Sequence, residues 1–166
     1  MGVIGLMHRL RILILVDGYL SYDPPCRNMA ETIIVRECRH GQVRVQFGNI
    51  IRVEGDVMVI PANNRLAGRE GLDEKMQLAA GEELRARCTE IAVERRKDGK
   101  QPCGVGEAVT TPGFNLPAEH LVHVVGPDCR RPNQDNFRRE LLVNSYNAMF
   151  QAVSYTHLRA HETCGH

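Results

Sequence analysis

A segment between Pro61 and Asp73 gathers residue types that could bind an anionic ligand and act on it. It reads Pro-Ala-Asn-Asn-Arg-Leu-Ala-Gly-Arg-Glu-Gly-Leu-Asp. Gly68 and Gly71 let the backbone approach a bulky ligand, and the free amides of a following helix N-terminus favour a phosphate. Asn63 adds an amide, and Asp73 adds a carboxylate whose ionised form the helix dipole should favour. We interpret the segment as a candidate ligand site, although a strand-end polar group and a helix cap would give the same pattern.

The elements around this segment would place it at the edge of a sheet. Residues 56–61 read Asp-Val-Met-Val-Ile-Pro, an apolar run that suits a strand covered on both faces. After the segment, Leu72, Met76 and Ala79 fall on one helical face. Ligands of open α/β sheets gather where strands end and loops lead into helices. The sequence therefore places the candidate site at the carboxyl end of the most buried strand.

The rest of the patterned region alternates strands with helices. The expected strands are residues 32–38, 42–47, 108–110 and 120–125, of which the first two form a hairpin. The expected helices begin after Gly81 and cover residues 136–152. Their inward side chains should be Leu84, Cys88 and Ile91 in the first helix, and Phe137, Leu141, Ser145, Ala148 and Ala152 in the second, with Leu142 and Met149 alongside that face. This order predicts an α/β layer structure with a largely parallel sheet.

The composition is that of an ordinary folded domain. The chain has 166 residues, 43% of them hydrophobic and 25% charged, with 21 basic and 20 acidic side chains. The longest apolar run, residues 12–16, is far too short to span a membrane, and no secretory cleavage site follows it. Short basic clusters such as residues 95–97 are interpreted as solvated surface, because nucleic-acid binding usually needs an excess of basic residues on one face. We therefore expect a cytoplasmic protein without nucleic-acid or membrane partners.

The cysteines and histidines are interpreted as structural. The six cysteines are expected to be reduced thiols, since nothing else in the sequence indicates secretion. Cys88 should pack in a helical core, whereas Cys103 should be exposed enough to react. His120 and His123 should lie on opposite faces of a strand, the first at an edge and the second in the core. The remaining candidates for metal ligation, which we attribute to chance spacing, are His157, His161, Cys164 and His166.

An ordered set of motifs from about residue 48 to residue 153 resembles the macrodomain family, whose members bind ADP-ribose. The motifs are Gly-Asn-Ile (48–50), Asp-Val-Met-Val-Ile-Pro-Ala-Asn (56–63), Leu-Ala-Gly-x-x-Gly-Leu-Asp (66–73), Ala-Ala-Gly-Glu-Glu-Leu (79–84), Gly-Glu-Ala (106–108), Thr-Pro-Gly-Phe-Asn-Leu-Pro (111–117) and His-x-Val-Gly-Pro (123–127). Their order and spacing make the resemblance specific. It implies a three-layer α/β/α fold with a mixed, largely parallel sheet.

The resemblance also implies roles for individual residues. Asn63 falls where the hydrolase branch of the family contacts the distal ribose, and Asp73 falls where that branch orients or activates the attacking water. The other implied ligand contacts are Ala62, Gly68, Gly71 and Leu72 around the diphosphate and distal ribose, with Asn49 and Ile50 near the adenine. Hydrolysis at the anomeric carbon needs a held ribose, a positioned water and a carboxylate. An amide and an ionised Asp can provide these without a metal or another cofactor.

Three positions depart from the family pattern. Asn49 replaces an aspartate that accepts a hydrogen bond from the adenine amino group, and an amide accepts less strongly than a charged partner. Arg69 and Glu70 replace glycines, so two side chains must fit beside the ligand. Ile60 replaces the first asparagine of the strand-end motif. These differences bear on substrate choice and turnover.

The two ends of the chain differ from its patterned middle. Residues 1–28 show no sustained period and are expected to be a non-native or disordered extension, which leaves residues 29–153 as the domain. Residues 154–166 resemble a translated sequencing adapter. A complete macrodomain would continue with another strand and a second phosphate loop. We therefore expect a C-terminally truncated domain that by itself binds ADP-ribose weakly or not at all.

Three functions stay open at this point. The first is a hydrolase that removes ADP-ribose from acidic side chains of proteins or deacetylates O-acetyl-ADP-ribose. The second is a non-catalytic reader that only holds ADP-ribose or an ADP-ribosylated protein, which Asn49, Arg69 and Glu70 would favour. The third is an inactive fragment. Turnover of ADP-ribosylated protein, and its loss when Asp73 is replaced, would separate the first two.

Overall fold

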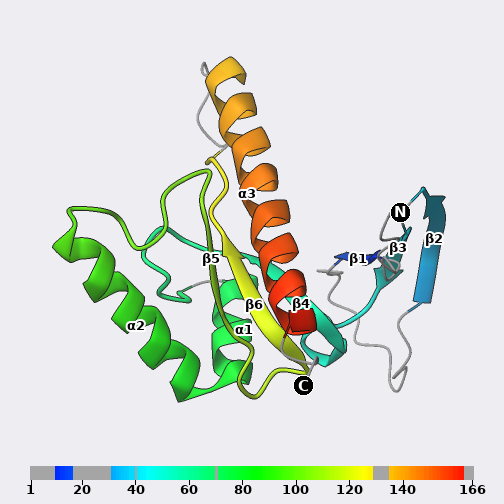
Figure 1. The fold of residues 1–166 in the computed structure, drawn as a ribbon, viewed down its shortest axis with the longest axis horizontal. Coiled ribbons are helices and arrows are strands. Elements are labelled where there is room, and N and C mark those ends of the chain that lie inside the picture. The colour runs from blue at the N-terminus through cyan, green and yellow to red at the C-terminus, as the bar shows by residue number, and fades with distance from the viewer. Residues whose placement is uncertain (1–9, 17–30, 40, 70, 129–134, 163–166) are drawn as a thin grey trace, which may run out of the picture. The chain divides into compact units, whose positions relative to one another are not determined.

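The computed structural model describes residues 10–16, 31–39, 41–69, 71–128 and 135–162 (Figure 1). These residues form two compact units, Met1–Arg52 and Val53–His166. The position of one unit relative to the other is not determined, so each is described by itself.

The first unit is built on a small mixed sheet. Its strands are β1 (Leu10–Val16), β2 (Glu31–Cys38) and β3 (Gly41–Phe47), in the order β1-β3-β2, and a 3-10 turn, η1 (Ile50–Arg52), follows them. β2 and β3 pair in antiparallel fashion, which confirms the predicted hairpin. β1 pairs with β3 in parallel and lies within the segment for which the sequence predicted no element.

The second unit is an α/β fold. In chain order it contains β4 (Gly55–Pro61), α1 (Gly71–Ala80), α2 (Glu82–Lys97), β5 (Ala108–Pro112), β6 (Ala118–Val124) and α3 (Asp135–Glu162). The strand order is β4-β6-β5, with β4 parallel to β6 and β5 antiparallel to β6. The sheet is therefore mixed, as the resemblance implied. It is less parallel than the alternation of elements predicted, because a short turn returns the chain from β5 directly into β6.

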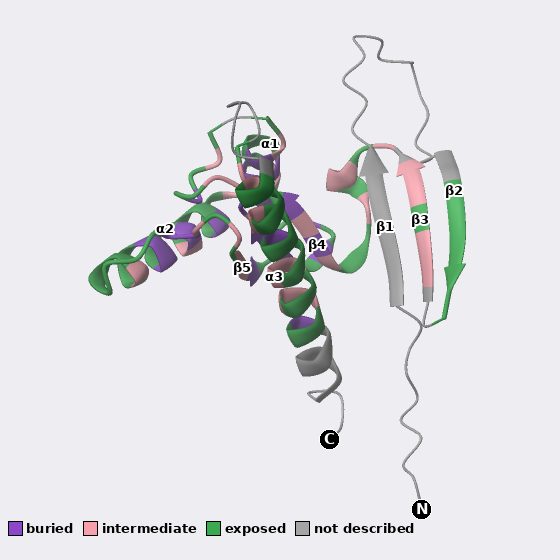
Figure 2. Ribbon diagram, turned by 90° about the horizontal axis from the view of Figure 1, so that it is seen from above, coloured by how far each residue is buried: buried purple, intermediate pink, exposed green. Residues whose placement is uncertain are grey.

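Helices cover both sides of this sheet. Figures 1 and 2 show α1 and α3 on opposite sides of the strands, which gives the predicted three layers. On the central strand β6, three consecutive side chains, Leu121, Val122 and His123, are fully buried, as a strand covered on both faces requires. On β4, Met58 and Ile60 are buried whereas Val57 and Val59 are partly exposed, so the prediction that this strand is covered on both faces is wrong. The core therefore lies around β6.

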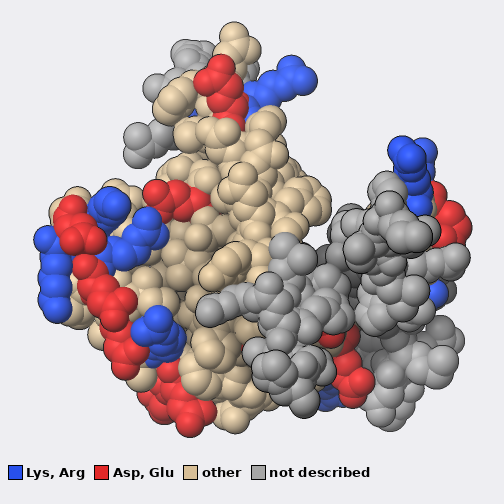
Figure 3. Space-filling model, in the orientation of Figure 1, with Lys and Arg blue, Asp and Glu red and all other residues tan. Residues whose placement is uncertain are grey.

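The connection between α1 and α2 depends on the motif glycine Gly81. Gly81 separates the helices with a φ of 94°, a conformation that favours glycine. A Cβ at Gly81 would lie 2.7 Å from Nδ2 of Asn115, in the β5–β6 turn. After the break, Leu84, Cys88 and Ile91 face the core as predicted. In Figure 3, basic and acidic side chains alternate on the visible outer surface of α2.

The helix α3 is longer than predicted and packs through a narrower stripe. It continues to Glu162 instead of ending near residue 152. Ser145 is buried and donates a hydrogen bond to the Val125 carbonyl at 3.1 Å. Phe137 was predicted on the inner face and Leu142 beside it, but they are 60% and 42% exposed. These two side chains flank the stripe that contacts the sheet.

The described cysteines are free thiols, namely Cys38, Cys88 and Cys103. Cys88 is buried, which confirms its predicted place in the core. The expected exposure of Cys103 is wrong, because the side chain is fully buried and its Sγ lies 3.6 Å from the Glu107 carbonyl oxygen. Burial raises the pKa of both buried thiols to about 11, so neither is ionised near neutral pH. Within the described ranges, no helix combines the length and apolarity needed to cross a bilayer.

His123 should make the fold sensitive to acid. Its ring is fully buried with Nε2 3.1 Å from Thr111 Oγ1, and burial lowers its pKa from 6.5 to about 4. Between these values the unfolded chain binds the proton and the folded chain does not, so the free energy of unfolding falls as the pH falls. The expected loss from pH 7 to pH 4 is about 3 kcal/mol. Urea unfolding at both pH values measures it.

The contribution of His123 separates from that of other titrating groups through two variants. His123→Gln keeps a hydrogen-bonding side chain but cannot take up a proton, so its unfolding free energy should depend less on pH. His120→Gln is the matched control, because His120 lies on the same strand but is only partly buried. That strand, β6, is the central one, so the predicted edge position of His120 is wrong. Equal pH dependence in His123→Gln and the unchanged chain would contradict the assignment.

Candidate functional site

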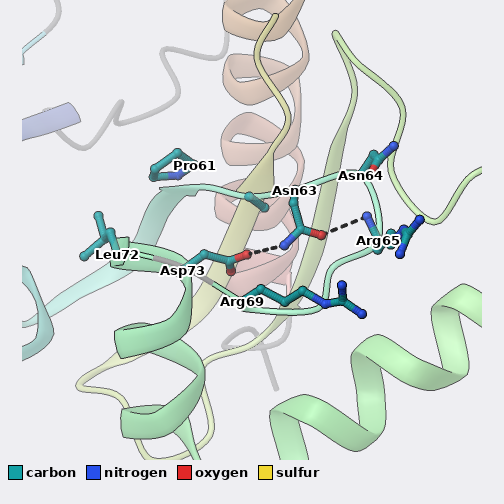
Figure 4. A pocket seen from close by; sticks show the side chains of 8 residues that line it. Pro61, Asn63, Asn64, Arg65, Arg69, Leu72 and Asp73 are labelled. Carbon is teal, nitrogen blue, oxygen red and sulfur yellow. Dashed lines mark hydrogen bonds between the residues drawn. The ribbon is translucent and has the colours of Figure 1, made fainter. Parts of the chain in front are cut away.

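A pocket of about 440 Å³ opens at the carboxyl end of β4, where the sequence placed the candidate site (Figure 4). Its walls come from the end of β4, the loop that follows it and the first turn of α1. The lining residues are Pro61, Ala62, Asn63, Asn64, Arg65, Arg69, Leu72 and Asp73. The strand and the helix thus bring together residues from both ends of the segment singled out in the sequence.

Asn63 is held in a single orientation by its own loop. Its Oδ1 accepts hydrogen bonds from the backbone N–H groups of Arg65 at 2.9 Å and Ala67 at 3.3 Å. Its backbone carbonyl accepts a third bond from the Leu66 N–H at 3.0 Å. With the side-chain oxygen occupied, Nδ2 is directed to Asp73 Oδ2 at 3.2 Å. Asn63 therefore turns the loop and positions the carboxylate at the same time.

The carboxylate of Asp73 is buried with one oxygen unpaired. Asp73 is 6% exposed, and its Oδ1 has no hydrogen-bond partner among the described residues. Burial raises the pKa of Asp73 above its ordinary value, against hydrogen bonds at Asn63 and Gly68. The sequence predicted the opposite direction from the helix dipole alone. Desolvation outweighs the dipole here, and a carboxylate with a raised pKa is a better proton acceptor.

The loop between the two site residues depends on a close contact at Gly68. Leu66 is buried with a φ of 54°, and its carbonyl accepts a hydrogen bond from Gln77 Nε2 at 3.0 Å. Gly68 follows with a φ of 53° and passes directly over the Gln77 side chain. Gln77 on α1 therefore fixes the loop that carries Arg69 into the pocket wall.

Replacing Gly68 by alanine should disturb this loop. The new Cβ would lie 2.4 Å from Gln77 Cδ, so the Gln77 side chain must move and its bond to Leu66 is lost. The expected loss in the free energy of unfolding is about 2 kcal/mol, from the clash and the strained φ together. Gly71→Ala is the matched control, since Gly71 also has a positive φ but open space around it. If thermal unfolding shows equal losses of stability in the two variants, the close contact between Gly68 and Gln77 does not stabilise the loop.

The pocket includes some predicted ligand contacts and not others. Ala62, Asn63, Leu72 and Asp73 line it together, whereas Gly68 and Gly71 do not, although both lie in its loop. The additional lining residues that sequence reasoning did not assign are Pro61, Asn64 and Arg65. Only their place near Asn63 in the same strand-end segment could have indicated that they line the pocket.

The predicted adenine contacts lie in the first unit, so their place at the pocket stays a prediction. Asn49 Oδ1 accepts the Ile51 N–H at 3.0 Å, and the Asn49 carbonyl accepts the Arg52 N–H at 3.2 Å. Asn49 thus caps the turn η1, which Ile50 begins. Glu70 lies outside the described residues.

The chemistry available at this pocket is that of one buried carboxylate beside one oriented amide. The unpaired Asp73 oxygen needs a donor, such as a water or a ligand hydroxyl. Arg65 and Arg69 add positive charge at the wall, which favours an anionic ligand. In the part of the chain that the structure describes, no three His, Cys, Asp or Glu residues gather to hold a metal. His157 and His161 have no described side chains, and Cys164 and His166 lie outside the described residues.

Comparison with known proteins shows the same family over this region. The family model for the Macro domain matches residues 59–163. The chain is 35% identical over 117 residues to a macro domain-containing protein of Cupriavidus necator, covering 70% of this chain and 64% of that protein. It is 37% identical over 116 residues to the O-acetyl-ADP-ribose deacetylase of Escherichia fergusonii, covering 69% of this chain and 62% of the deacetylase.

A longer match is with the protein-ADP-ribose hydrolase of Staphylococcus aureus, to which the chain is 35% identical over 135 residues. It covers 78% of this chain and 49% of the hydrolase. The chain therefore spans less than two thirds of the length of these relatives.

The fold has solved counterparts. The Oceanobacillus iheyensis macrodomain with ADP superimposes with a TM-score of 0.68 at 27% identity, over 77% of this chain and 65% of that structure. With the family model over most of the second unit, these likenesses place the chain in the macro domain family.

Proposed function

We propose that the pocket at the end of β4 binds ADP-ribose and hydrolyses its ester bond to an acidic side chain of a modified protein. The deacetylase and hydrolase relatives act on ADP-ribose derivatives, as their names state. The observation that carries the proposal is the unpaired, buried oxygen of Asp73 beside the oriented Asn63 amide. This pair offers a hydroxyl-rich ligand a hydrogen-bond acceptor and a held donor at the same wall.

In this proposal Asp73 acts as the general base. It accepts a proton from a water, whose oxygen attacks the anomeric carbon of the distal ribose. The bond between that carbon and the substrate carboxylate oxygen breaks, and the leaving carboxylate takes the electron pair. Asn63 is a positioning residue, since its Nδ2 donates to Asp73 Oδ2 and leaves Oδ1 for the water. The raised pKa of Asp73 favours its role as proton acceptor.

The two guanidinium groups at the wall suit the diphosphate. Arg65 and Arg69 line the pocket together with the loop amides. Figure 4 shows both side chains extending to the side of the pocket opposite Leu72. A diphosphate on that side would gain charge-assisted hydrogen bonds, which are stronger than neutral ones.

Titration with ADP-ribose tests the binding step. Amide shifts of the isotope-labelled chain, followed up to millimolar ADP-ribose, detect even weak binding. We expect the largest shifts at Ala62, Asn63, Leu72 and Asp73. Shifts confined to the loop around Cys103 would place the ligand elsewhere and contradict the proposal. Release of ADP-ribose from protein modified on acidic side chains then tests the hydrolysis.

A non-catalytic reader is the second candidate, and the position of Arg69 favours it. This long side chain lines the pocket where the family more often has glycine. A guanidinium that binds the ligand tightly but holds it away from Asp73 would give affinity without turnover. Binding of ADP-ribose together with no release from modified protein would support the reader.

A further inference from the structure

A second hollow of about 350 Å³ adjoins the candidate pocket and shares Asn64 and Arg65 with it. Its other lining residues come from the end of α2 and the loop that follows, and they include Arg96, Lys100 and Gln101. Three of its lining side chains are cationic, and none is acidic. The hollow is therefore a basic surface that continues directly from the wall of the candidate site.

The three cations are not used by the fold. Arg65, Arg96 and Lys100 are exposed, and none of them is in a salt bridge among the described residues. The nearby carboxylate of Glu107 is held by Arg95, whose Nη2 lies 2.8 Å from Glu107 Oε2. Lys100 adds only a long-range influence on that carboxylate. The positive charge of the hollow thus remains available to a ligand.

Capping of α2 does not explain these side chains either. Basic residues in a last helical turn commonly interact with the free carbonyls there. Here the Arg95 carbonyl accepts the N–H groups of Asp98 at 3.2 Å and Lys100 at 2.9 Å, and the Arg96 carbonyl accepts the Gly99 N–H at 3.0 Å. These backbone bonds satisfy the Arg95 and Arg96 carbonyls without help from either side chain, so the Arg96 and Lys100 side chains stay available to a partner.

Hydrogen bonds fix the walls of the hollow relative to the candidate pocket. The Cys103 N–H donates to the Asn64 carbonyl at 3.2 Å and ties the two loops together. Arg95 Nη1 donates to the Pro102 carbonyl at 2.9 Å and holds the second loop against α2. A ligand that reaches from one pocket to the other would therefore meet a preformed surface.

We propose that this cationic hollow binds acidic side chains of the protein segment whose ADP-ribosylated residue occupies the neighbouring pocket. The inference rests on the proposed function, and it adds a peptide-recognition subsite to it. Arg65 lies in the shared wall, so it would be near both the ADP-ribosyl group and the flanking peptide. Acidic residues around a modified site would then strengthen binding.

The charge distribution favours a short acidic peptide over nucleic acid. Nucleic-acid binding relies on many phosphate contacts along an extended basic face. On α2, Arg85 and Arg87 are instead paired with Glu82 and Glu90 at 3.0 Å and 2.9 Å. Arg65, Arg96 and Lys100 gather around one hollow of about 350 Å³, which suits a few carboxylates rather than an extended phosphate backbone.

The test compares two synthetic peptides that each carry ADP-ribose on a central residue. One has aspartates on both sides of that residue, and the other has asparagines. The chain should bind the acidic peptide about tenfold more tightly at low salt, as a few exposed ion pairs predict. The double variant Arg96→Gln/Lys100→Gln should remove this preference and leave the affinity for free ADP-ribose unchanged. Lys97→Gln, which changes a neighbouring cation outside the hollow, should retain it.

Several outcomes would overturn the inference. Equal affinity for the two peptides, or a preference that survives in the double variant, would show that the hollow does not read acidic residues. Tighter binding of a single-stranded oligonucleotide than of the acidic peptide, lost in the same double variant, would assign the surface to nucleic acid instead. An unmodified aspartate-rich peptide keeps this test separate from the proposed function. If it shifts the Arg96 and Lys100 amides while free ADP-ribose shifts none, the subsite stands and the ADP-ribose proposal fails.

Discussion

Asp73→Asn should abolish hydrolysis of ADP-ribosylated protein while ADP-ribose still binds. An amide cannot accept a proton from water, and loss of a general base typically lowers a rate by about 10²- to 10⁴-fold. The substitution keeps the size of the side chain, so we expect the affinity for ADP-ribose to stay within about tenfold. Single-turnover release of ADP-ribose measures the first effect, and titration measures the second. Equal loss of binding and turnover would show that Asp73 holds the ligand rather than acting on water.

The stability of this variant separates a chemical role from a structural one. Burial raises the pKa of Asp73, so the ionised carboxylate lowers the free energy of unfolding once the pH exceeds the ordinary pKa of an aspartate. The protonated Asp73 therefore contributes to the free energy of unfolding at low pH. This contribution is lost as the pH rises through the pKa that Asp73 has in the folded chain. The neutral amide of the Asp73→Asn variant should therefore leave the melting temperature at neutral pH unchanged or raise it. Glu74→Gln is the matched control, since Glu74 is exposed in the same helical turn and should alter neither turnover nor stability.

The sequence located the candidate site because its key residues are close along the chain. One strand, one loop and one helical turn carry both Asn63 and Asp73, so a local pattern sufficed to place them at the same sheet edge. The direction of the Asp73 pKa shift could not be predicted in this way. That shift depends on how completely neighbouring elements bury the carboxylate, whereas the dipole argument uses the helix alone.

The basic hollow needed the tertiary structure for the same reason. Arg96 lies at the end of α2 and Lys100 lies in the loop after it, both far along the chain from Arg65. The sequence showed Arg96 only within the short basic cluster at residues 95–97 and did not single out Lys100. The loop at Cys103 approaches Asn64 through a backbone hydrogen bond, and backbone bonds leave no signal in side-chain patterning. The same loop buries Cys103, which explains why its predicted exposure was wrong.

The helical periodicity of α3 predicted its existence better than its contacts. Ser145 faces the sheet as expected, but Phe137 and Leu142 are mostly exposed. Apolar residues at helical spacing define a broad face, and only the partner surface decides which part of it is covered. Strand bounds were predicted more accurately. The alternating residues 42–47 lie in β3 and the apolar run 56–61 lies in β4, each within one residue of the observed strand.

Gly113→Ala should destabilise the fold by about 3 kcal/mol or more, which is among the larger effects of a single substitution. The added Cβ would lie 1.8 Å from the backbone carbonyl oxygen of Ala118, and a backbone atom cannot move aside as a side chain can. The turn from β5 to β6 would have to open. The hydrogen bond from the Gly113 N–H to the Glu119 carbonyl, now 2.8 Å long, would weaken.

The effect should reach the candidate site through the packing of this turn on the helices. Asn115 in the turn donates its N–H to the Ala80 carbonyl at 3.4 Å, at the end of the helix that begins beside Asp73. Gly55→Ala is the matched control, because a Cβ there meets nothing within 4 Å and should change the unfolding free energy by less than about 0.5 kcal/mol. Chemical unfolding of both variants, with amide shifts of α1 in the folded state, checks the prediction. If Gly113→Ala unfolds like Gly55→Ala, the turn is not the rigid support of α1 that its contacts indicate.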